Sequence, residues 1–322
     1  MKILVVGGAG YIGSHVVREL LDTGNNITVF DNFSSGSKTN LFSESNFIKG
    51  DILNYSDISK AAAGYNAIIH LAAFKAAGES MIAPEKYSVN NITGTINILN
   101  AALENGIKNI VFSSSAAVYG EPEYTPVDEK HPVNPKNYYG FTKLEIERIM
   151  TWYDKLKGLR YASLRYFNAA GYDINGRIMS LEKNPANLIP IVMETAAGKR
   201  KELQIFGGDY DTPDGTCIRD YIHVNDLAVG HRLALDYIIK QDKSITVNLG
   251  SETGLSVLEI IETARKITGK KINANIVKRR EGDPATLVSS AKKALEILEW
   301  KSTYSDASTL ITTSWNVYRR QK

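Results

Sequence analysis

A tyrosine and a lysine four residues apart, Tyr139 and Lys143, stand in the stretch NYYGFTK. On a helix this spacing puts both side chains on one face, one turn apart. An ammonium group beside a phenol favours the phenolate and lowers the pKa of the tyrosine. The pair is therefore suited to act as a general base near neutral pH.

The spacing alone is weakly specific, because the 17 tyrosines of the chain give two further pairs, Tyr153 with Lys157 and Tyr318 with Lys322. Only the first pair opens a predicted helix shortly after a strand that ends in a serine cluster, Ser113 to Ser115. We expect Ser115 to donate a hydrogen bond to a reacting oxygen beside Tyr139. A tyrosine packed on the sheet beside a solvated lysine is the alternative, and we prefer it for the other two pairs.

The start of the chain has the pattern of a dinucleotide site. Ile3 to Val6 is a short apolar run of the kind found in strands that are buried on both faces. Four glycines follow, and an amphipathic helical pattern begins near Tyr11; the glycines are Gly7, Gly8, Gly10 and Gly13. They allow a tight turn and bring the backbone close to a pyrophosphate at the positive end of the helix.

An acidic residue completes this pattern. Asp31 ends the next predicted strand, 18 residues past Gly13, close to the spacing of about 20 expected for the acid that binds a ribose hydroxyl. A carboxylate there repels a 2′-phosphate, so we expect NAD rather than NADP as the cofactor. The alternative is an ordinary glycine turn with an unrelated surface aspartate, but the strand, the helix and the acid together favour the nucleotide.

These residues need a scaffold, and the first half of the chain alternates apolar β-rich runs with helical patterns. The predicted strands are 3–6, 27–30, 46–48, 67–70, 109–113 and 160–164, and the predicted helices are 11–23, 55–63, 84–105 and 138–157. Such an alternation predicts an α/β fold with a doubly wound parallel sheet, which binds ligands at the carboxyl ends of its strands.

Beyond Leu164 the alternation weakens. Helices are expected near 187–198, 224–240, 255–267, 290–298 and 306–318. We expect residues 1–167 to form the nucleotide-binding domain and 168–322 a smaller mixed α/β lobe, with a segment near 222–250 as a candidate to return to the first sheet.

Composition restricts the class of protein. The 322 residues carry a net charge of only +3, which gives no reason to expect nucleic acid as a partner. Cys217 is the single cysteine, so an intrachain disulfide cannot form. The five histidines have no metal-ligand spacing, and we expect no metal. No signal peptide and no apolar run of membrane-spanning length is found. We therefore expect a cytoplasmic protein with no membrane association.

The motifs as a set resemble those of the extended short-chain dehydrogenases/reductases, and within them the UDP-glucose (UDP-galactose) 4-epimerase family. The stretches that carry the resemblance include GGAGYIG (7–13), DNFSSG (31–36), HLAAFKAAGES (70–80), FSSSAAVYGE (112–121), YYGFTK (138–143), LRYFNAAG (164–171), NLIP (187–190) and RREGDPATLV (279–288). A further match is FGGDYDTPDGTCIRDYIHVNDLA (206–228), and this stretch, LRYFNAAG, NLIP and RREGDPATLV are the more specific to sugar-nucleotide epimerases. The matches span almost the whole chain in the expected order.

The resemblance implies a Rossmann domain, NAD as a tightly held cofactor, and reversible inversion at C4 of a UDP-hexose through a 4-keto intermediate. It assigns to the NAD site Gly7, Gly10, Tyr11, Ile12, Gly13, Asp31, Asn32, Asp51, Ile52, Phe74, Lys75, Asn91, Tyr139, Lys143 and Phe167. It assigns to the UDP-sugar site Ser115, Tyr139, Asn168, Asn187, Leu188, Arg219, Arg280, Asp283 and Leu287. Tyr139, Lys143 and Ser115 would be catalytic. For Arg219, a surface pair with Asp220 is a rival interpretation.

Two departures from the family pattern matter. Ala117 stands where many 4-epimerases have threonine. The related dehydratases have Thr-Asp-Glu where this chain has Ser115-Ala116-Ala117, so the acid–base pair for elimination is missing. At the position that gates sugar size in the family, Leu287 is neither the bulky tyrosine that excludes an N-acetyl group nor a small residue that admits one.

Three alternatives stay open. The nearest is a UDP-N-acetylglucosamine or UDP-pentose 4-epimerase, which differs only in the sugar pocket. The second is a net sugar-nucleotide oxidoreductase, and the third is a non-catalytic NAD-binding regulator. The resemblance also implies a homodimer that pairs through the helices predicted at 84–105 and 138–157.

Overall fold

A seven-stranded parallel sheet forms the centre of the computed structural model, which describes residues 1–183, 185–280 and 282–320. Its strand order is β10-β6-β5-β4-β1-β2-β3. The strands are β1 (Lys2–Val6), β2 (Asn26–Asp31), β3 (Asn46–Lys49), β4 (Ala67–His70), β5 (Asn109–Ser113), β6 (Arg160–Tyr166) and β10 (Ile245–Leu249). The predicted doubly wound parallel sheet is confirmed, and the six predicted strands agree with β1 to β6 within two residues.

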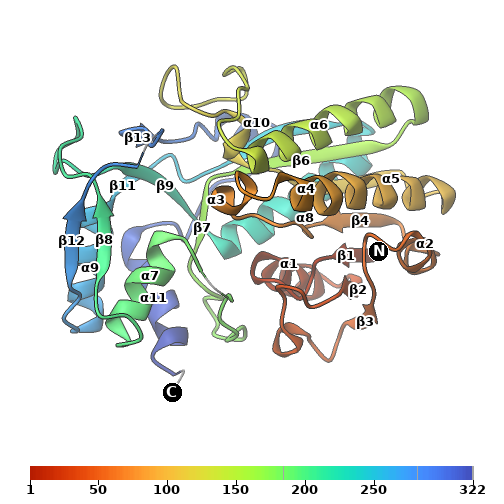
Figure 1. Ribbon diagram of the computed structural model, residues 1–322. Helices are drawn as coiled ribbons and strands as arrows, with labels where there is room; N and C mark the ends of the chain where they lie inside the picture. Colours follow the sequence, from red (N-terminus) through yellow and green to blue (C-terminus); the bar gives the residue numbers. More distant parts are fainter. Residues whose placement is uncertain (184, 281, 321–322) are drawn as a thin grey trace.

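Helices cover both faces of this sheet (Figure 1). Side chains alternate along a strand, so Ile3 and Val5 of β1 face one side and Leu4 and Val6 the other, all fully buried. The first face packs against α1 (Tyr11–Asp22) and α8 (Val224–Gln241). The second packs against α2 (Tyr55–Ala62), α5 (Gly94–Glu104) and α6 (Tyr138–Lys157). Burial on both faces explains the continuous apolar run at the start of the chain.

The helix predicted over 84–105 consists of three consecutive segments. They are α4 (Pro84–Tyr87), a π-helical segment over Ser88–Thr93, and α5. A π-helical turn shifts the helix register locally, and such turns are frequent at functional sites. Here the segment contains Asn91, whose side chain is buried and bonded to the loop after β4.

The rest of the chain forms what we term the second lobe, at the left of Figure 1. Its strand β9 (Ile218–His223) pairs with β7 (Asn168–Ala170), with β11 (Gly254–Ser256) and with β13 (Thr286–Leu287). A separate pair joins β8 (Leu203–Phe206) to β12 (Ala274–Val277). The helices α7 (Leu188–Ala196), α9 (Val257–Thr268) and α11 (Ala307–Tyr318) pack together beside these strands.

The sequence analysis missed the strands of the second lobe. They have two to six residues each, too few to establish a period, and their partners are distant in the chain. By contrast, β10 pairs in parallel with β6 as an edge strand of the first sheet, and α8 packs against α1 on one face of that sheet. The short helices α3 (Ala77–Ser80) and α10 (Lys292–Leu298) complete the fold. Over the described ranges, no helix is long and apolar enough to cross a membrane.

The buried histidines include His15, His70, His223 and His231. Burial lowers the pKa of His15 and of His231 to about 4, and the pKa of His70 and of His223 to about 3. In the unfolded chain each would bind a proton near pH 6.5. Below that pH the unfolded state takes up protons that the folded state excludes. The free energy of unfolding therefore falls as the pH is lowered from about 6.5 toward 4.

We predict that His231→Asn flattens this pH dependence. The Nδ1 atom of His231 lies 2.8 Å from the carbonyl oxygen of Leu227, a contact that an asparagine amide can replace. Loss of one titrating group should decrease the slope of the unfolding free energy between about pH 6 and 5 by about 1.4 kcal/mol per pH unit. Urea unfolding across this range measures the slope. Near pH 8 the two slopes should coincide, and equal slopes in the acid range would contradict the prediction.

Candidate functional site

The glycine turn between β1 and α1 leaves no room for side chains. Gly7 has φ +85°, and a Cβ there would lie 2.6 Å from the backbone nitrogen of Ala72. A Cβ on Gly13 would lie 2.2 Å from the carbonyl oxygen of Gly7. The turn therefore needs glycine for conformation and for close packing. It leaves the first N–H groups of α1 directed at the carboxyl edge of the sheet, where an anion can bind.

Asp31 ends β2 beside this turn. Its two carboxylate oxygens accept hydrogen bonds from the backbone N–H groups of Ala9, at 3.0 Å, and Phe33, at 2.7 Å. Burial raises the pKa of Asp31, and these two hydrogen bonds oppose the rise. Each carboxylate oxygen keeps a second lone pair that can accept from a hydroxyl group. The carboxylate is thus fixed in orientation and able to bind a diol.

The neighbouring residues assigned to an adenosine lie together. The Asn32 amide donates to Asp51 at 3.0 Å, which joins the loops after β2 and β3. Ile52 is buried against Gly94 of α5, where a Cβ added to Gly94 would lie 2.5 Å from the Ile52 side chain.

Tyr11 and Ile12 begin α1, and the Tyr11 hydroxyl donates to the carbonyl of Gly171 in the second lobe.

The loop after β4 is fixed by Asn91. Its side chain accepts from the Phe74 N–H at 2.9 Å and donates to the Phe74 carbonyl at 3.0 Å. It also lies 3.3 Å from the hydroxyl of Thr142 on α6. Asn91 therefore positions Phe74 and Lys75 with its own amide. Lys75 is half exposed and forms an ion pair with Glu182.

The three serines after β5 have different partners. Ser113 is hydrogen-bonded to the hydroxyl of Tyr166, and Ser114 donates to Glu147 of α6. Ser115 is hydrogen-bonded to Tyr139 and accepts from the N–H of Ala117 at 3.1 Å. Of these serines, Ser115 is the one whose hydroxyl faces the Tyr139 phenol.

Local sequence explains how α6 brings Tyr139 to this position. Asn137 caps the helix, because its side chain accepts from the N–H of Gly140 at 2.8 Å. A Cβ on Gly140 would lie 2.4 Å from the carbonyl oxygen of Ala117. A glycine at position 140 therefore lets the first turn of α6 pack against the segment that follows Ser115.

Lys143 lies one turn further along the buried face of α6. Its Nζ donates to the carbonyl oxygen of Ser113 at 2.6 Å and stands 5.8 Å from the centre of the Tyr139 ring. Burial lowers the pKa of Lys143 to about 7, against the opposing charge of Glu147. Glu147 is itself held by a buried ion pair with Arg165 at 2.6 Å.

Lys143 was predicted to lower the pKa of the Tyr139 phenol, and this lowering is not found. Burial raises the pKa of Tyr139, and the opposing contribution comes from the hydrogen bond to Ser115. The physical reason is the burial of Lys143 itself, which lowers its pKa to about 7 and so reduces its charge near neutral pH.

The rival tyrosine–lysine pairs lie elsewhere. The Tyr153 hydroxyl donates to Asn100 of α5, on the outer side of the helices, and Lys157 is exposed. Tyr318 is buried in the second lobe, and Lys322 lies outside the described residues.

Residues assigned to a UDP group gather on the second lobe. Arg219 and Asp283 form an ion pair at 3.4 Å, although 64 residues separate them in the chain. The rival interpretation of Arg219, a surface ion pair with Asp220, is wrong. Asp220 is fully buried and its carboxylate accepts from Ser251 and Ser289, because β9 directs neighbouring side chains to opposite faces.

Arg280 stacks on an aromatic ring that the sequence analysis missed. Its guanidinium lies 3.7 Å from the centre of the Phe206 ring, at the end of β8. Asn168 donates to the carbonyl of Asp220 at 2.9 Å. Asn187 is the N-cap residue of α7, and Leu188 begins that helix. Phe206 is the first residue of the stretch FGGDYDTPDG. The motif was noted in the sequence analysis, but Phe206 was not singled out as a site residue.

Leu287 lies directly beside Arg219, since β13 and β9 pair in that register. It packs with Phe167 against an apolar cluster that includes Val118 and Leu144. Leu287 therefore connects the strand that bears Arg219 with the segment after Ser115 and with α6.

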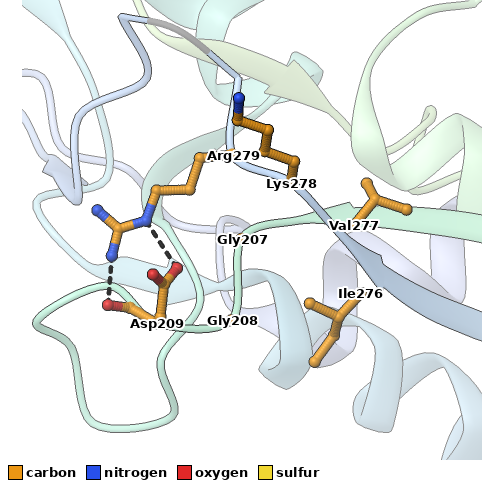
Figure 2. Close-up of a pocket in the computed structure, with 7 residues that line it drawn as sticks. All are labelled: Gly207, Gly208, Asp209, Ile276, Val277, Lys278 and Arg279. Atoms are coloured by element: carbon orange, nitrogen blue, oxygen red, sulfur yellow. Dashed lines mark hydrogen bonds and ion pairs between the residues drawn. The ribbon is translucent and has the colours of Figure 1, made fainter.

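Figure 2 shows a hollow where β8 and β12 end, next in the chain to Phe206 and Arg280. It is lined by Gly207, Gly208, Asp209, Ile276, Val277, Lys278 and Arg279. The Arg279 Nε donates to the Asp209 carboxylate at 2.7 Å, which fixes the loop that follows Phe206. The hollow borders the residues assigned to the nucleotide and is formed by other elements than those that carry Tyr139.

The arrangement has the parts of a dinucleotide-dependent enzyme that moves a proton on and off a hydroxyl. Glycines and a carboxylate form a nucleotide cradle, and a buried phenol, a serine and a lysine meet at the end of β5. Within the described ranges, no group of three acidic, histidine or cysteine side chains could hold a metal.

The chain belongs to the NAD dependent epimerase/dehydratase family, whose model matches residues 3–250. It is 46% identical over 318 residues to the UDP-glucose 4-epimerase of Lacticaseibacillus casei, an alignment that covers 98% of this chain and 96% of that protein. The UDP-glucose 4-epimerase of Brucella ovis in complex with NAD has a TM-score of 0.96 and 41% identity, with 99% and 98% coverage. The UDP-Glc/GlcNAc 4-epimerase of Campylobacter jejuni has a TM-score of 0.88 and 38% identity, with 100% and 99% coverage.

Proposed function

We propose that this protein interconverts UDP-galactose and UDP-glucose by inversion at C4, with bound NAD as a catalytic group. The observation that carries the proposal is the meeting of Ser115, Tyr139 and Lys143 at the end of β5, beside a glycine cradle that fits a dinucleotide. The full-length similarity to two UDP-glucose 4-epimerases supports the same activity.

NAD would be held by residues 1–167 and the UDP group by residues 168–322. The cradle of Gly7, Gly10 and Gly13 has backbone where any other residue would have a side chain, so a pyrophosphate can reach the N–H groups of α1. Asp31 would bind the adenosine ribose. When bound, the oxidised nicotinamide would supply a positive charge and would accept a hydrogen with its electron pair from the sugar and then return it.

Tyr139 would take the proton of the 4-hydroxyl at its phenol oxygen while Ser115 hydrogen-bonds the same oxygen. Burial keeps the phenol protonated without a ligand, so the base would form only when further positive charge is present. Lys143 would hold its ammonium 5.8 Å from the Tyr139 ring by donating to Ser113. After the sugar turns, the phenol would return its proton to the oxygen of the 4-keto group.

The UDP group would be bound by the charged residues of the second lobe. Arginines suit a diphosphate because they are always charged and donate in pairs. Arg219 lies next to Leu287 across β9 and β13, and Arg280 is stacked on Phe206. Firm binding of the nucleotide would leave the hexose free to turn between its two faces.

We predict that Tyr139→Phe lowers kcat for UDP-galactose by about 10²- to 10⁴-fold, the usual worth of a general base. NAD binding should be preserved, because the ring remains. A coupled assay for UDP-glucose measures turnover. Tyr153→Phe is the matched control, since Tyr153 has the same spacing to a lysine on the same helix, and it should keep activity. Near-normal turnover by Tyr139→Phe would remove Tyr139 from the mechanism.

A UDP-N-acetylhexosamine 4-epimerase is the second candidate. Leu287 is smaller than the tyrosine that excludes an N-acetyl group in the family, and the Campylobacter jejuni relative is named for both sugars. A UDP-pentose would also fit the same chemistry. A net oxidoreductase would instead produce NADH in proportion to product, and a non-catalytic regulator would not need Tyr139 and Lys143.

We predict that Leu287→Tyr lowers kcat/KM for UDP-N-acetylglucosamine by about tenfold or more and leaves UDP-galactose within about twofold. A tyrosine adds bulk beside Arg219, and one misplaced group in a pocket costs about 1–3 kcal/mol. Steady-state assays with both substrates measure the ratio. An unchanged ratio would show that Leu287 does not select the sugar.

We also propose a homodimer that pairs through α4 to α6. Phe141, Trp152 and Leu156 are 38%, 60% and 69% exposed, and their spacing puts them on one side of α6, opposite Tyr139 and Lys143. A second copy of this chain would cover this apolar strip.

A cytoplasmic location is proposed as well, since the one cysteine leaves no intrachain disulfide.

Leu156→Glu should convert the dimer to a monomer, because it would place a charge in the apolar contact. Leu295→Glu is the matched control, since Leu295 is also exposed, on α10 away from this strip. Sedimentation equilibrium measures the mass of each variant. A monomeric wild-type chain, or a dimer that survives Leu156→Glu, would refute this interface.

A further inference from the structure

The segment between β7 and α7 reaches from the second lobe to the nucleotide cradle. Leu181 packs against the apolar cluster of α7, α9 and α11. The next two residues, Glu182 and Lys183, carry opposite charges and contact loops of the first sheet. The contacts of these two side chains therefore decide how the segment lies against the cradle.

Glu182 contacts the loop after β4. Its carboxylate forms an ion pair with the ammonium of Lys75, and only 15% of the Glu182 side chain is exposed. The backbone of Glu182 is also hydrogen-bonded to the side chain of Tyr172 in the second lobe. Lys75 follows Phe74, whose backbone is fixed by Asn91. Glu182 thus joins the second lobe to a loop that is already held in place.

Lys183 contacts the loop after β2. Its Nζ donates to the carbonyl oxygen of Gly36 at 3.1 Å. Gly36 packs on the glycine turn, since a Cβ there would lie 2.9 Å from the backbone of Ala9. Burial raises the pKa of Asp31, and the positive charge of Lys183 is among the influences that lower it. Lys183 thus adds a positive charge beside the cradle.

The two contacts reach opposite ends of the proposed dinucleotide site. Asp31 and Gly36 follow β2, where the adenosine would lie, and Phe74 and Lys75 follow β4 on the other side of β1. Each contact is a charged group on a partly buried partner, so it resists opening more than a solvated surface pair does. A ligand that binds both loops is released more slowly when the second lobe is tied to both.

We propose that Glu182 and Lys183 form a strap that retains the nicotinamide dinucleotide, by tying the second lobe to the loops after β2 and β4. The inference rests on the proposed function, because an epimerase must return the same hydrogen to the sugar. A cofactor that left in mid-reaction would leave the 4-keto sugar behind. The strap serves retention and takes no part in proton transfer.

The test is the rate at which the loaded protein releases NAD. Glu182→Gln removes the negative charge of one contact, Lys183→Met removes the donor of the other, and both keep the size of the side chain. Each should accelerate release about tenfold, and the double variant about a hundredfold if the contacts act independently. An auxiliary dehydrogenase that reduces free NAD measures release by absorbance. The exposed neighbours Lys201 and Glu202 supply the matched control, Lys201→Met/Glu202→Gln, which should release NAD at the wild-type rate.

The outcomes separate the strap from the proposed function. Release at the wild-type rate by all three strap variants, with their folds intact by circular dichroism, would overturn the strap alone. A wild-type protein that binds no NAD would overturn the strap and the proposed function together. Faster release by the control variant as well would also count against the strap, because any loss of charge would then have the same effect.

Discussion

The close packing of α6 on the end of β5 is the constraint on which the rest of the site depends. Gly140 brings the helix to the carbonyl of Ala117, and Lys143 donates to the carbonyl of Ser113. With two backbone contacts at consecutive turns, the helix cannot rotate or slide without losing one of them. Tyr139 directly precedes Gly140 and shares a helix face with Lys143, so it is held beside Ser115.

The same packing makes the site electrostatically demanding. Burial raises the pKa of Tyr139 and lowers the pKa of Lys143 to about 7, so both groups are pushed toward their neutral forms. Glu147 opposes the shift at Lys143 and is balanced by Arg165. A buried acid–base pair with reduced charge responds strongly to one added charge, because little water is present to screen it. In the proposed function, a bound oxidised nicotinamide would add this positive charge.

The second lobe differs from the first sheet in how it holds its charged residues. Arg219 and Arg280 lie on or near short strands that are fixed by buried carboxylates and by ion pairs. The Asp220 carboxylate joins β9 to the segments that contain Ser251 and Ser289. Such rigid attachment would suit the proposed function, in which the sugar must turn while the nucleotide stays bound.

The sequence by itself determined the parallel sheet, the glycine turn, Asp31 and the helix that carries Tyr139 and Lys143. These features depend on local periodicity and on spacing within one strand–helix unit, where neighbours in sequence are neighbours in space. It also favoured Ser115 among three adjacent serines, through position alone.

Only the tertiary structure decided which charges meet. The partner of Arg219 is Asp283 and the buried carboxylate of Asp220 serves two serines, because strand pairing in the second lobe joins distant segments. The direction of the Tyr139 pKa shift, the ring beneath Arg280 and the contacts of Glu182 and Lys183 likewise depend on burial and on long-range packing. Spacing along the chain does not encode the distance between segments that pair through space, and burial is a property of the whole fold.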